Sequence, residues 1–282
     1  MKLYRISKGS LLQHDNASYL ITQPWDELIG RDQLHDYLRQ QVRHADLLTP
    51  VEADALLNSR LLAPIGAQEV WAAGVTYLRS RDARMEESKE SGGATFYDKV
   101  YEAERPELFF KSQPHRVAAH DEEVYIRHDS TWNVPEPELT LFISPSGAIQ
   151  GYTIGNDMSS RSIEGENPLY LPQAKVYQRS AALGPCLYVP AHPLPTTTRI
   201  SMVIRRGGKD VYAGEVAISQ IKRKLSDLAA WLYRDMDFPH GCFLMTGTCL
   251  VPGNEFTLEK GDRVEITIDH IGTLSNTVGY KK

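Results

Sequence analysis

The sequence predicts a mixed α+β fold that is built mainly from β-strands and carries a small N-terminal region. Strand-like runs recur between residues 123 and 268, and one clear amphipathic helix interrupts them. Residues 62–66 contain the helix breakers Pro64 and Gly66, and the pattern changes from helical to strand-like after them. We therefore divide the chain into a small N-terminal region, residues 1–65, and a second domain, residues 66–282.

Composition and charge indicate an ordinary globular protein. The 282 residues include 31 Lys and Arg against 36 Asp and Glu, which gives a formal net charge of −5. This acidic balance argues against a nucleic acid or an anionic membrane as the main partner. The sequence contains no GxGxxG, GxxxxGK[ST], HExxH or GxSxG motif, so nucleotide cofactors, zinc-protease chemistry and a serine-hydrolase elbow lack support.

The cysteines and the N-terminus favour a cytoplasmic protein. Cys186, Cys242 and Cys249 form no Cys-x-x-Cys pair, which suits a reducing compartment, and we expect all three to be buried. Residues 1–5 lead into no apolar signal-peptide region, and no run approaches 18 apolar residues. We therefore expect a soluble protein with no membrane partner.

The individual elements follow from periodicity and turn signals. In the N-terminal region, residues 34–42 have helical spacing and residues 51–62 form a second short helical stretch, so we expect this region to be helical. The later amphipathic helix covers residues 221–232, with the basic residues 222–224 on a solvated face. Residues 138–143 and 149–154 flank a Pro-Ser-Gly turn and predict a β-hairpin. The other strand-like runs are residues 123–127, 199–205, 243–246 and 264–268.

The segment Val134–Leu139 contains the most informative pattern, Val-Pro-Glu-Pro-Glu-Leu. A residue before proline is held extended, and side chains two apart on an extended chain point to one face, roughly 6.5 Å apart. Glu136 and Glu138 therefore converge, while the apolar Leu139, Leu141 and Ile143 lie on the opposite face.

Two interpretations of these carboxylates remain open. Adjacent carboxylates repel each other unless a cation or a shared proton compensates. The strand that returns from the hairpin leads to Asp157, which could add a third carboxylate, and three such oxygens with open positions for water and substrate describe a Mg²⁺ site. The alternative is a pair of surface glutamates on an edge strand, where proline is tolerated.

At these residues the sequence resembles the fumarylacetoacetate hydrolase family. The resemblance implies a mixed β-sandwich roll, a homodimer or homotetramer, and a divalent cation on three carboxylates, which here are Glu136, Glu138 and Asp157. The cation would be Mg²⁺, with Mn²⁺ or Ca²⁺ as substitutes. The shared elements, in order, are residues 73–77, 107–111, 136–139, 151–157, 183–185, 246–248 and 261–262.

Departures from the family pattern point to one subgroup. Hydrolases of the family carry a histidine three residues after the tyrosine of the first motif, and Ser80 occupies that position here. Without the imidazole, the usual base for a hydrolytic water is missing. Residues 105–111, 132–138 and 167–175 resemble the 2-keto-3-deoxy-sugar-acid dehydratases. This resemblance implies a hydro-lyase that removes water from a 2-keto-3-deoxy pentonate and gives a 2,5-dioxo acid.

A metal-assisted elimination assigns roles to two further residues. We expect Lys175 to take the C3 proton of the substrate, because a neighbouring cation and partial desolvation lower the pKa of an amine. We expect Glu107 to protonate the departing C4 hydroxyl. Each residue has another interpretation: Lys175 could simply pair with the carboxylates, and Glu107 could hold a water on the metal.

Four residues are candidates for binding the 2-keto acid. Ser80 and Arg81 would hold the substrate carboxylate from a lid, since the arginine fork suits a carboxylate, and residues 86–95 would close over the site. Thr246 and Thr248 flank a glycine and could bind the carboxylate or the keto group.

Other activities remain compatible with the sequence. A C–C bond hydrolase acting on a diketo acid would need another water base, for which Glu87 is the candidate. A decarboxylase or a tautomerase would use the same chelated 2-keto acid. A protein that binds metal and 2-keto acids without turnover is the non-enzymatic alternative.

Overall fold

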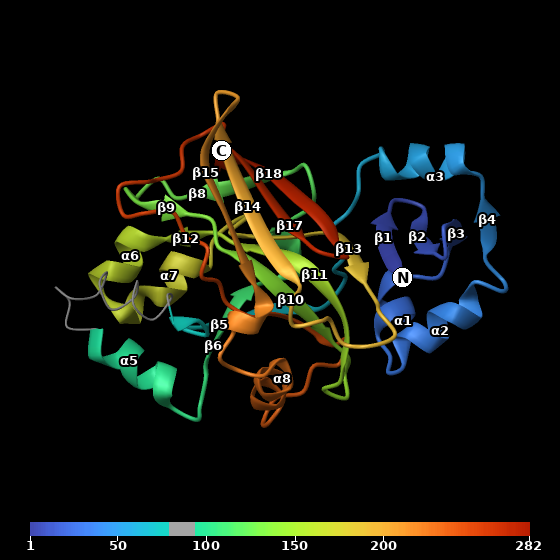
Figure 1. The fold of residues 1–282 in the computed structure, drawn as a ribbon, viewed down its shortest axis with the longest axis horizontal. Helices are drawn as coiled ribbons and strands as arrows, with labels where there is room; N and C mark the ends of the chain where they lie inside the picture. Colours follow the sequence, from blue (N-terminus) through green and yellow to red (C-terminus); the bar gives the residue numbers. More distant parts are fainter. Residues whose placement is uncertain (79–93) are drawn as a thin grey trace.

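The structure of the protein is a computed structural model that describes residues 1–78 and 94–282 (Figure 1). Most of the described strands belong to one large sheet, with the order β4-β3-β2-β1-β13-β11-β10-β16-β5-β6 and β7 paired to β13. Its strands are β1 (Lys2–Ile6), β2 (Gly9–His14), β3 (Ala17–Ile21), β4 (Asp46–Leu48), β5 (Glu69–Gly74), β6 (Glu107–Ser112), β7 (Val117–Ala118), β10 (Pro137–Ile143), β11 (Ile149–Asp157), β13 (Ala181–Tyr188) and β16 (Cys242–Met245).

A smaller sheet packs against one face of the large one. It has the order β15-β14-β17-β18-β8, and a separate pair joins β12 and β9. These strands are β8 (Glu123–Ile126), β9 (Asn133–Val134), β12 (Ser159–Ser160), β14 (Arg199–Arg206), β15 (Lys209–Ala217), β17 (Arg263–Ile268) and β18 (Gly272–Tyr280). The helices are α1 (Trp25–Ile29), α2 (Leu34–Gln41), α3 (Pro50–Leu57), α5 (Ala94–Glu102), α6 (Arg161–Glu166), α7 (Leu171–Lys175) and α8 (Leu225–Leu232), with 3-10 turns at Pro114–Arg116, Pro168–Tyr170 and Ile218–Gln220.

The main core lies between the two sheets. Leu139 and Leu141 of β10 and Met202 and Ile204 of β14 are fully buried in one cluster. They occupy alternate positions, as expected of strands that turn one face towards a partner sheet. The predicted α+β fold, mainly of strands, is confirmed.

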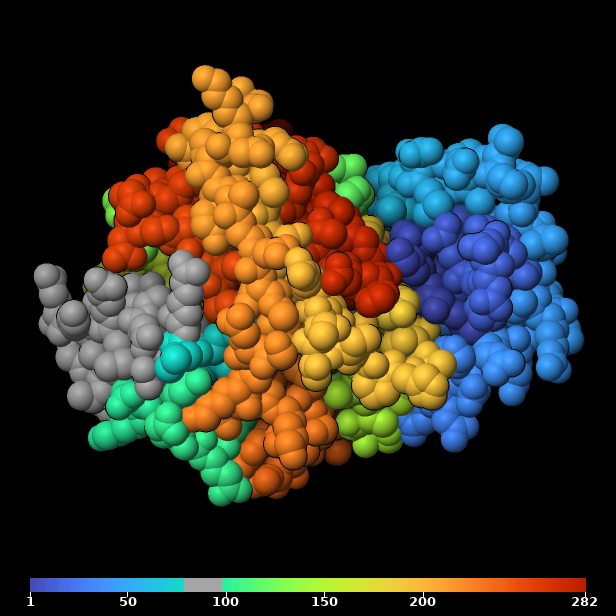
Figure 2. Space-filling model, in the orientation of Figure 1, coloured from blue at the N-terminus to red at the C-terminus, as the bar shows by residue number. Residues whose placement is uncertain are grey.

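A second core covers the other face of the large sheet. Phe142 of β10 and Phe243 of β16 point to this side, where Leu28 of α1 and Leu38 of α2 are also fully buried. Figure 2 shows the N-terminal residues gathered at one end of the molecule, away from α5. The large sheet is therefore covered on both faces.

The expectation of a helical N-terminal region is wrong in part. Helix α2 matches the expected helix, but β1, β2 and β3 form a meander that joins the large sheet through the pairing of Lys2 with Tyr188. Leu3 belongs to one core cluster and Tyr4 to the other. A strand that is buried on both faces lacks the alternation of apolar and polar residues by which a strand is recognised in sequence.

Two predicted helices are shorter than expected. Helix α3 ends at Leu57, because the chain then turns to pair Leu62 with Arg5. Helix α8 begins at Leu225, because the backbone N–H of Lys222 donates to the Thr76 carbonyl at 3.0 Å. The prediction that residues 222–224 lie on a solvated face is also wrong in part, because Arg223 is half-buried.

Arg223 is half-buried within the basic run 222–224. Its guanidinium donates to the carbonyls of Val100, Ala103 and Glu104, at the end of α5, at 2.8–3.0 Å. A guanidinium at a helix C-terminus satisfies carbonyls that have no partner within the helix.

The hairpin and the cysteines follow the predictions. Strands β10 and β11 pair antiparallel, and Ser144 and Ala148 close the turn between them. Cys186, Cys242 and Cys249 are buried and free. Within residues 1–78 and 94–282, no helix has the length and apolar character needed to cross a membrane.

Candidate metal centre and active site

The hairpin of β10 and β11 brings three carboxylates together. Glu136 precedes β10 and pairs through its backbone with Asp157 at the end of β11, with N–H to carbonyl distances of 2.9 and 3.2 Å. Residues that lie opposite each other in antiparallel strands carry their side chains on the same face. Glu138 lies two residues along β10 and shares this face.

These three side chains can offer oxygens to one ion. Glu136, Glu138 and Asp157 are each at most 3% exposed, and one carboxylate oxygen from each lies within 4.8 Å of the others. Carboxylate oxygens are the ligands that Mg²⁺ prefers, and in an octahedral site with ligands about 2.1 Å from the ion, adjacent oxygens are about 3.0 Å apart and opposite oxygens about 4.2 Å apart. A small closure of the side chains therefore suffices to bind a divalent cation.

The pKa of Glu138 is raised by its surroundings in the cluster. Burial raises the pKa of its carboxyl well above the ordinary value of 4.5, and the charges of Asp157 and Glu136 raise it further. The backbone N–H of Gly247 donates to Glu138 Oε2 at 2.6 Å and opposes this shift. A cation between the carboxylates would remove the repulsion that favours the protonated form.

Lys175 reaches this cluster from the end of α7. Its Nζ donates to Glu136 Oε2 at 2.5 Å, to Asp157 Oδ2 at 3.1 Å and to Ser159 Oγ at 2.5 Å. The side chain is 1% exposed. Lys175 therefore lies within reach of any ligand that shares the carboxylates, although the same contacts also fit the simpler role of a counter-ion.

A second buried lysine, Lys111, contacts the carboxylate cluster from β6. Lys111 of β6 is fully buried, and its Nζ lies 2.5 Å from Asp157 Oδ1. It also donates to the carbonyls of Met158 and Lys175, at 3.0 and 2.5 Å. Burial lowers the pKa of Lys111, and the charge of Asp157 opposes that shift. Lys111 thus connects one candidate ligand to the backbone of the candidate base.

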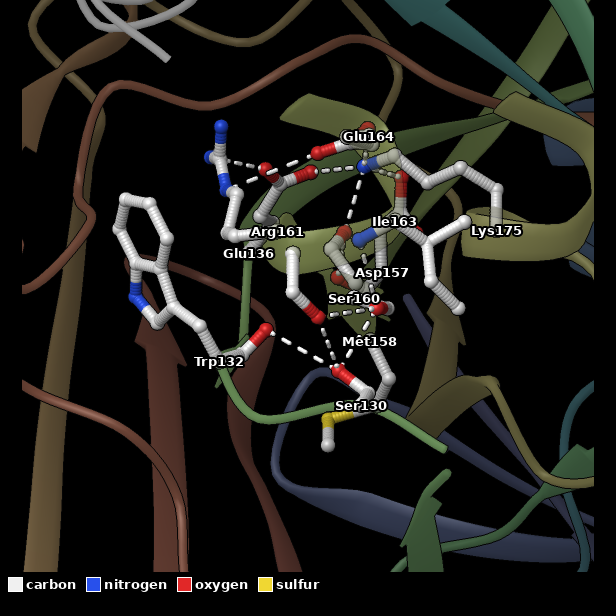
Figure 3. A network of polar contacts seen from close by, with 12 residues as sticks. Ser130, Trp132, Glu136, Asp157, Met158, Ser160, Arg161, Ile163, Glu164 and Lys175 are labelled. Carbon is white, nitrogen blue, oxygen red and sulfur yellow. Dashed lines mark hydrogen bonds and ion pairs between the residues drawn. The ribbon is translucent and has the colours of Figure 1, made fainter. Parts of the chain in front are cut away.

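Helix α6 adds an ion pair that borders the same centre (Figure 3). Arg161 bonds Glu136 Oε1 through Nη2, and its Nε lies 3.7 Å from Glu164 Oε2. Glu164 Oε1 lies 3.6 Å from Lys175 Nζ. The helix starts where it does because Ser160 Oγ accepts from the N–H of Ile163, which satisfies one of the unpaired donors of the first turn.

The charge balance of these buried groups favours the binding of a cation. Among the described residues of this cluster that are at most 3% exposed, four carboxylates face three cations, which is one negative charge in excess when all are ionised. A buried charge without compensation is costly, so this excess favours a bound cation. The carboxylates belong to Glu136, Glu138, Asp157 and Glu164, and the cations to Lys111, Arg161 and Lys175.

A small cavity opens above the cluster. Phe109 of β6 forms part of its wall, with Lys175 Nζ 5.8 Å from the ring centre. Thr248 also lines it, while its Oγ accepts from the N–H of Leu250 at 3.2 Å. The described lining residues are Ala73, Gly74, Val75, Phe109, Glu136, Glu138, Asp157, Arg161, Lys175, Gly247 and Thr248.

The other predicted site residues have different outcomes. Glu107 of β6 lies beside the cavity, since its carboxylate faces Gly74, which lines it. Thr246 is not among the described residues that line the cavity. Its hydroxyl and its N–H both donate to the Leu139 carbonyl, at 2.8 and 3.1 Å.

Ser80 and Arg81 lie outside the described residues, and so do Glu87 and the greater part of the expected closing segment, residues 86–95.

Sequence reasoning missed the roles of three residues. Lys111 stands in an apolar strand, and its only local signal is a charge within the run Leu-Phe-Phe-Lys. Arg161 and Glu164 stand in the polar segment 159–175, three residues apart, which is the spacing of a pair on one helix face. That spacing could have identified the pair, but not its contact with Glu136.

Comparison with known proteins identifies relatives along the whole chain. A probable 2-keto-3-deoxyxylonate dehydratase of Haloferax volcanii is 46% identical over 226 residues, which cover 80% of this chain and 77% of that protein. A 2-dehydro-3-deoxy-D-arabinonate dehydratase of Saccharolobus solfataricus is 37% identical over 290 residues, covering 100% and 97% of the two chains.

A solved structure and a family match agree with these relatives. The structure of 2-keto-3-deoxy-D-arabinonate dehydratase complexed with magnesium and 2,5-dioxopentanoate has a TM-score of 0.85 and 35% identity, and both chains are covered completely. Residues 70–279 match the fumarylacetoacetate (FAA) hydrolase C-terminal family. The resemblance found in the sequence is confirmed, and the chain belongs to the fumarylacetoacetate hydrolase family.

Proposed function

We propose that this protein is a Mg²⁺-dependent hydro-lyase that removes water from a 2-keto-3-deoxy pentonate and yields 2,5-dioxopentanoate. The observation that carries the proposal is the contact of Lys175 Nζ with Glu136 and Asp157 inside a buried cluster of three carboxylates. Two relatives named as dehydratases of such acids, 46% and 37% identical, and a solved relative holding magnesium and the dioxo acid support it.

Glu136, Glu138 and Asp157 would hold the ion, for which Mn²⁺ or Ca²⁺ can substitute because all three prefer oxygen ligands. Bound there, Mg²⁺ would polarise the 2-keto oxygen of the substrate and so acidify the neighbouring C–H. The charge balance fits this use. With Lys175 counted as an ammonium group, one excess negative charge in the described centre, a divalent cation and a monoanionic keto acid together are neutral, and the proton that Lys175 must lose to act as a base leaves one net negative charge.

Lys175 is the proposed base. Neutralising the charges of Glu136 and Asp157 removes the support that these carboxylates give to the ammonium form, so Lys175 can act as a free amine. It would then take a proton from C3. Phe109 borders it and excludes water from that side of the cavity.

Glu107 is the proposed acid. It would donate a proton to the C4 hydroxyl, which departs as water when the C3–C4 double bond forms. Transfer of a proton from C5 to C3 then gives an enol with a C4–C5 double bond, and movement of the enol hydroxyl proton to C4 gives the dioxo acid. Thr248, with Ser80 and Arg81 from outside the described residues, would bind the substrate carboxylate and keto group.

Dehydration fits the site better than hydrolysis of a C–C bond. The family's hydrolases need an imidazole to activate water, and no histidine is present among the described residues that line the cavity. A decarboxylase or tautomerase would bind the same keto acid, but neither reaction expels a C4 hydroxyl group that Glu107 would protonate.

The test is the variant Lys175→Ala, assayed with saturating Mg²⁺ for formation of the aldehyde product. We expect a loss of about 10²–10⁴-fold in kcat, the usual share of an acid–base group. Lys209→Ala, which removes an exposed lysine of β15, is the matched control. Activity of Lys175→Ala within tenfold of the parent would contradict the assignment of Lys175 as the base. Turnover after exhaustive chelation would contradict the requirement for a metal ion.

We also propose the organisation in which the enzyme works. Residues 66–282 form the catalytic part and residues 1–65 an accessory region, since the described lining residues all lie between Ala73 and Thr248. A homodimer or homotetramer in the cytosol is the proposed assembly, and the three free cysteines suit that compartment. Light scattering coupled to size-exclusion chromatography gives the oligomeric state.

A further inference from the structure

Glu164 is a buried carboxylate for which the proposed chemistry has no use. It is 2% exposed and is not one of the three carboxylates that converge on the candidate metal position. Its two oxygens face two different cations, with Oε1 3.6 Å from Lys175 Nζ and Oε2 3.7 Å from Arg161 Nε. These contacts are ion pairs that lie just outside hydrogen-bond distance.

The same two cations also hold Glu136, at shorter range. Arg161 Nη2 bonds Glu136 Oε1, and Lys175 Nζ donates to Glu136 Oε2 at 2.5 Å. Arg161, Glu136, Lys175 and Glu164 therefore form a closed ring in which positive and negative charges alternate (Figure 3). In this ring each cation has one nearer and one farther carboxylate.

A divalent cation on Glu136 would disturb this arrangement. It would approach a carboxylate whose two oxygens already carry a guanidinium and an ammonium group, and like charges repel strongly at buried sites. The two cations then need another anion, because an unpaired buried charge is costly. Glu164 is the nearby carboxylate, and a shift of less than one ångström would bring either cation within hydrogen-bond distance.

We propose that Glu164 is the counter-ion to which Arg161, and Lys175 while it is protonated, shift when a divalent cation binds Glu136, Glu138 and Asp157. Glu164 is then a positioning residue, since it acts through Arg161 and Lys175 and touches neither ion nor substrate. The inference rests on the proposed metal-dependent function, because the shift has no cause without a bound cation.

The backbone that carries Arg161 and Glu164 is fixed by hydrogen bonds that do not involve the side chains of the ring. The N–H of Arg161 donates to the Trp132 carbonyl at 2.8 Å. Ser160 Oγ donates to Ser130 Oγ at 2.7 Å and accepts from Ile163 at the start of α6. The helix that carries both Arg161 and Glu164 is therefore anchored independently of Glu136.

The variant Glu164→Gln tests the proposal, because it removes the charge and keeps the shape. Mg²⁺ affinity is measured by calorimetry, and thermal unfolding is measured with and without Mg²⁺. We expect Mg²⁺ to bind about 10–100-fold more weakly, as is usual when an outer partner of a metal site is lost. We expect the variant to lose more stability in the Mg²⁺-bound form than in the metal-free form. Glu166→Gln, on the exposed side of the same helix, is the control.

The outcomes separate this inference from the proposed function. If the parent protein binds no Mg²⁺, the proposed function fails. If the parent binds Mg²⁺ and Glu164→Gln binds it within twofold as tightly, the variant has lost equal stability in both forms and Glu164 is only structural. A variant that cannot fold without metal would also overturn the inference.

A second variant isolates the mechanism. In a Lys175→Met background one of the two cations is absent, so Glu164→Gln should weaken Mg²⁺ binding by a smaller factor than in the parent. An equal factor in both backgrounds would show that Glu164 does not act through Lys175.

Discussion

Gly74 lies directly against the carboxylate of Glu107: a Cβ atom placed on Gly74 would stand 2.0 Å from Glu107 Oε2. The two residues are register partners in β5 and β6, and Gly74 lines the cavity. The Glu107 carboxylate can therefore lie over β5, beside the cavity, only because position 74 has no side chain.

The variant Gly74→Ala should displace the Glu107 carboxylate without touching the carboxylate cluster on β10 and β11. The backbone of Gly74 is outside the positive-φ region, so alanine causes no backbone strain there. We expect kcat to fall by at least about 10²-fold, close to the effect of Glu107→Gln. Mg²⁺ affinity, measured by calorimetry, should stay unchanged. A variant with the parent kcat would exclude Glu107 as the acid.

The part of this site that could be predicted from sequence depends on local backbone rules. Proline after Val134 and after Glu136 holds the chain extended, and the period of a strand then places Glu136 and Glu138 on one face. The turn between β10 and β11 fixes a pairing that brings Asp157 opposite Glu136. Each step involves residues that are near in sequence or joined by a short turn.

The parts that were missed depend on contacts between distant segments. Lys111 meets Asp157 although β10, β16 and β5 lie between β6 and β11 in the order of the large sheet, and sequence periodicity does not predict that order. The N-terminal strands were missed because β1 is buried on both faces, so its apolar residues do not alternate. A contact between distant segments also engages the Thr246 hydroxyl, which donates to the Leu139 carbonyl.

Mg²⁺ binding should strengthen as the pH rises. The pKa of Glu138 is raised in the metal-free protein, so part of the population carries a proton there at pH values above 4.5. That proton must leave before the carboxylate can bind the ion, so binding releases it. Calorimetry in two buffers of different ionisation enthalpy should detect the release, and the affinity should fall between about pH 8 and about pH 5. An affinity that does not change over this range would contradict the raised pKa.

Loss of the cap on α6 should weaken the fold slightly. Ser160 Oγ accepts from the N–H of Ile163 and donates to Ser130 Oγ. Ser160→Ala removes both bonds, and we expect the free energy of unfolding to fall by about 1–2 kcal/mol, the upper part of the range for an N-cap. Denaturant titration measures the change, and Ser226→Ala, at an exposed position of α8, is the control. A loss no larger than that of the control would mean that the cap contributes nothing.

Removing the buried ammonium group of Lys111 should destabilise the metal-free protein most. Lys111→Met keeps the volume of the side chain, but it leaves the Asp157 carboxylate without its 2.5 Å partner and the Met158 and Lys175 carbonyls without a donor. Breaking a buried ion pair costs about 3–5 kcal/mol, which denaturant titration in the presence of a chelator would detect. Lys209→Met, on exposed β15, should change the free energy of unfolding by less than about 0.5 kcal/mol.

Addition of Mg²⁺ then distinguishes the charge from the packing at Lys111. A cation bound by Asp157 supplies the positive charge that the variant lacks, so Mg²⁺ should stabilise Lys111→Met by more than it stabilises the parent protein. The Met158 and Lys175 carbonyls stay without a donor in either form, so the recovery should be incomplete. If Mg²⁺ stabilises the variant and the parent equally, the cost of the substitution comes from the carbonyls and the packing, and Lys111 does not compensate the charge of Asp157.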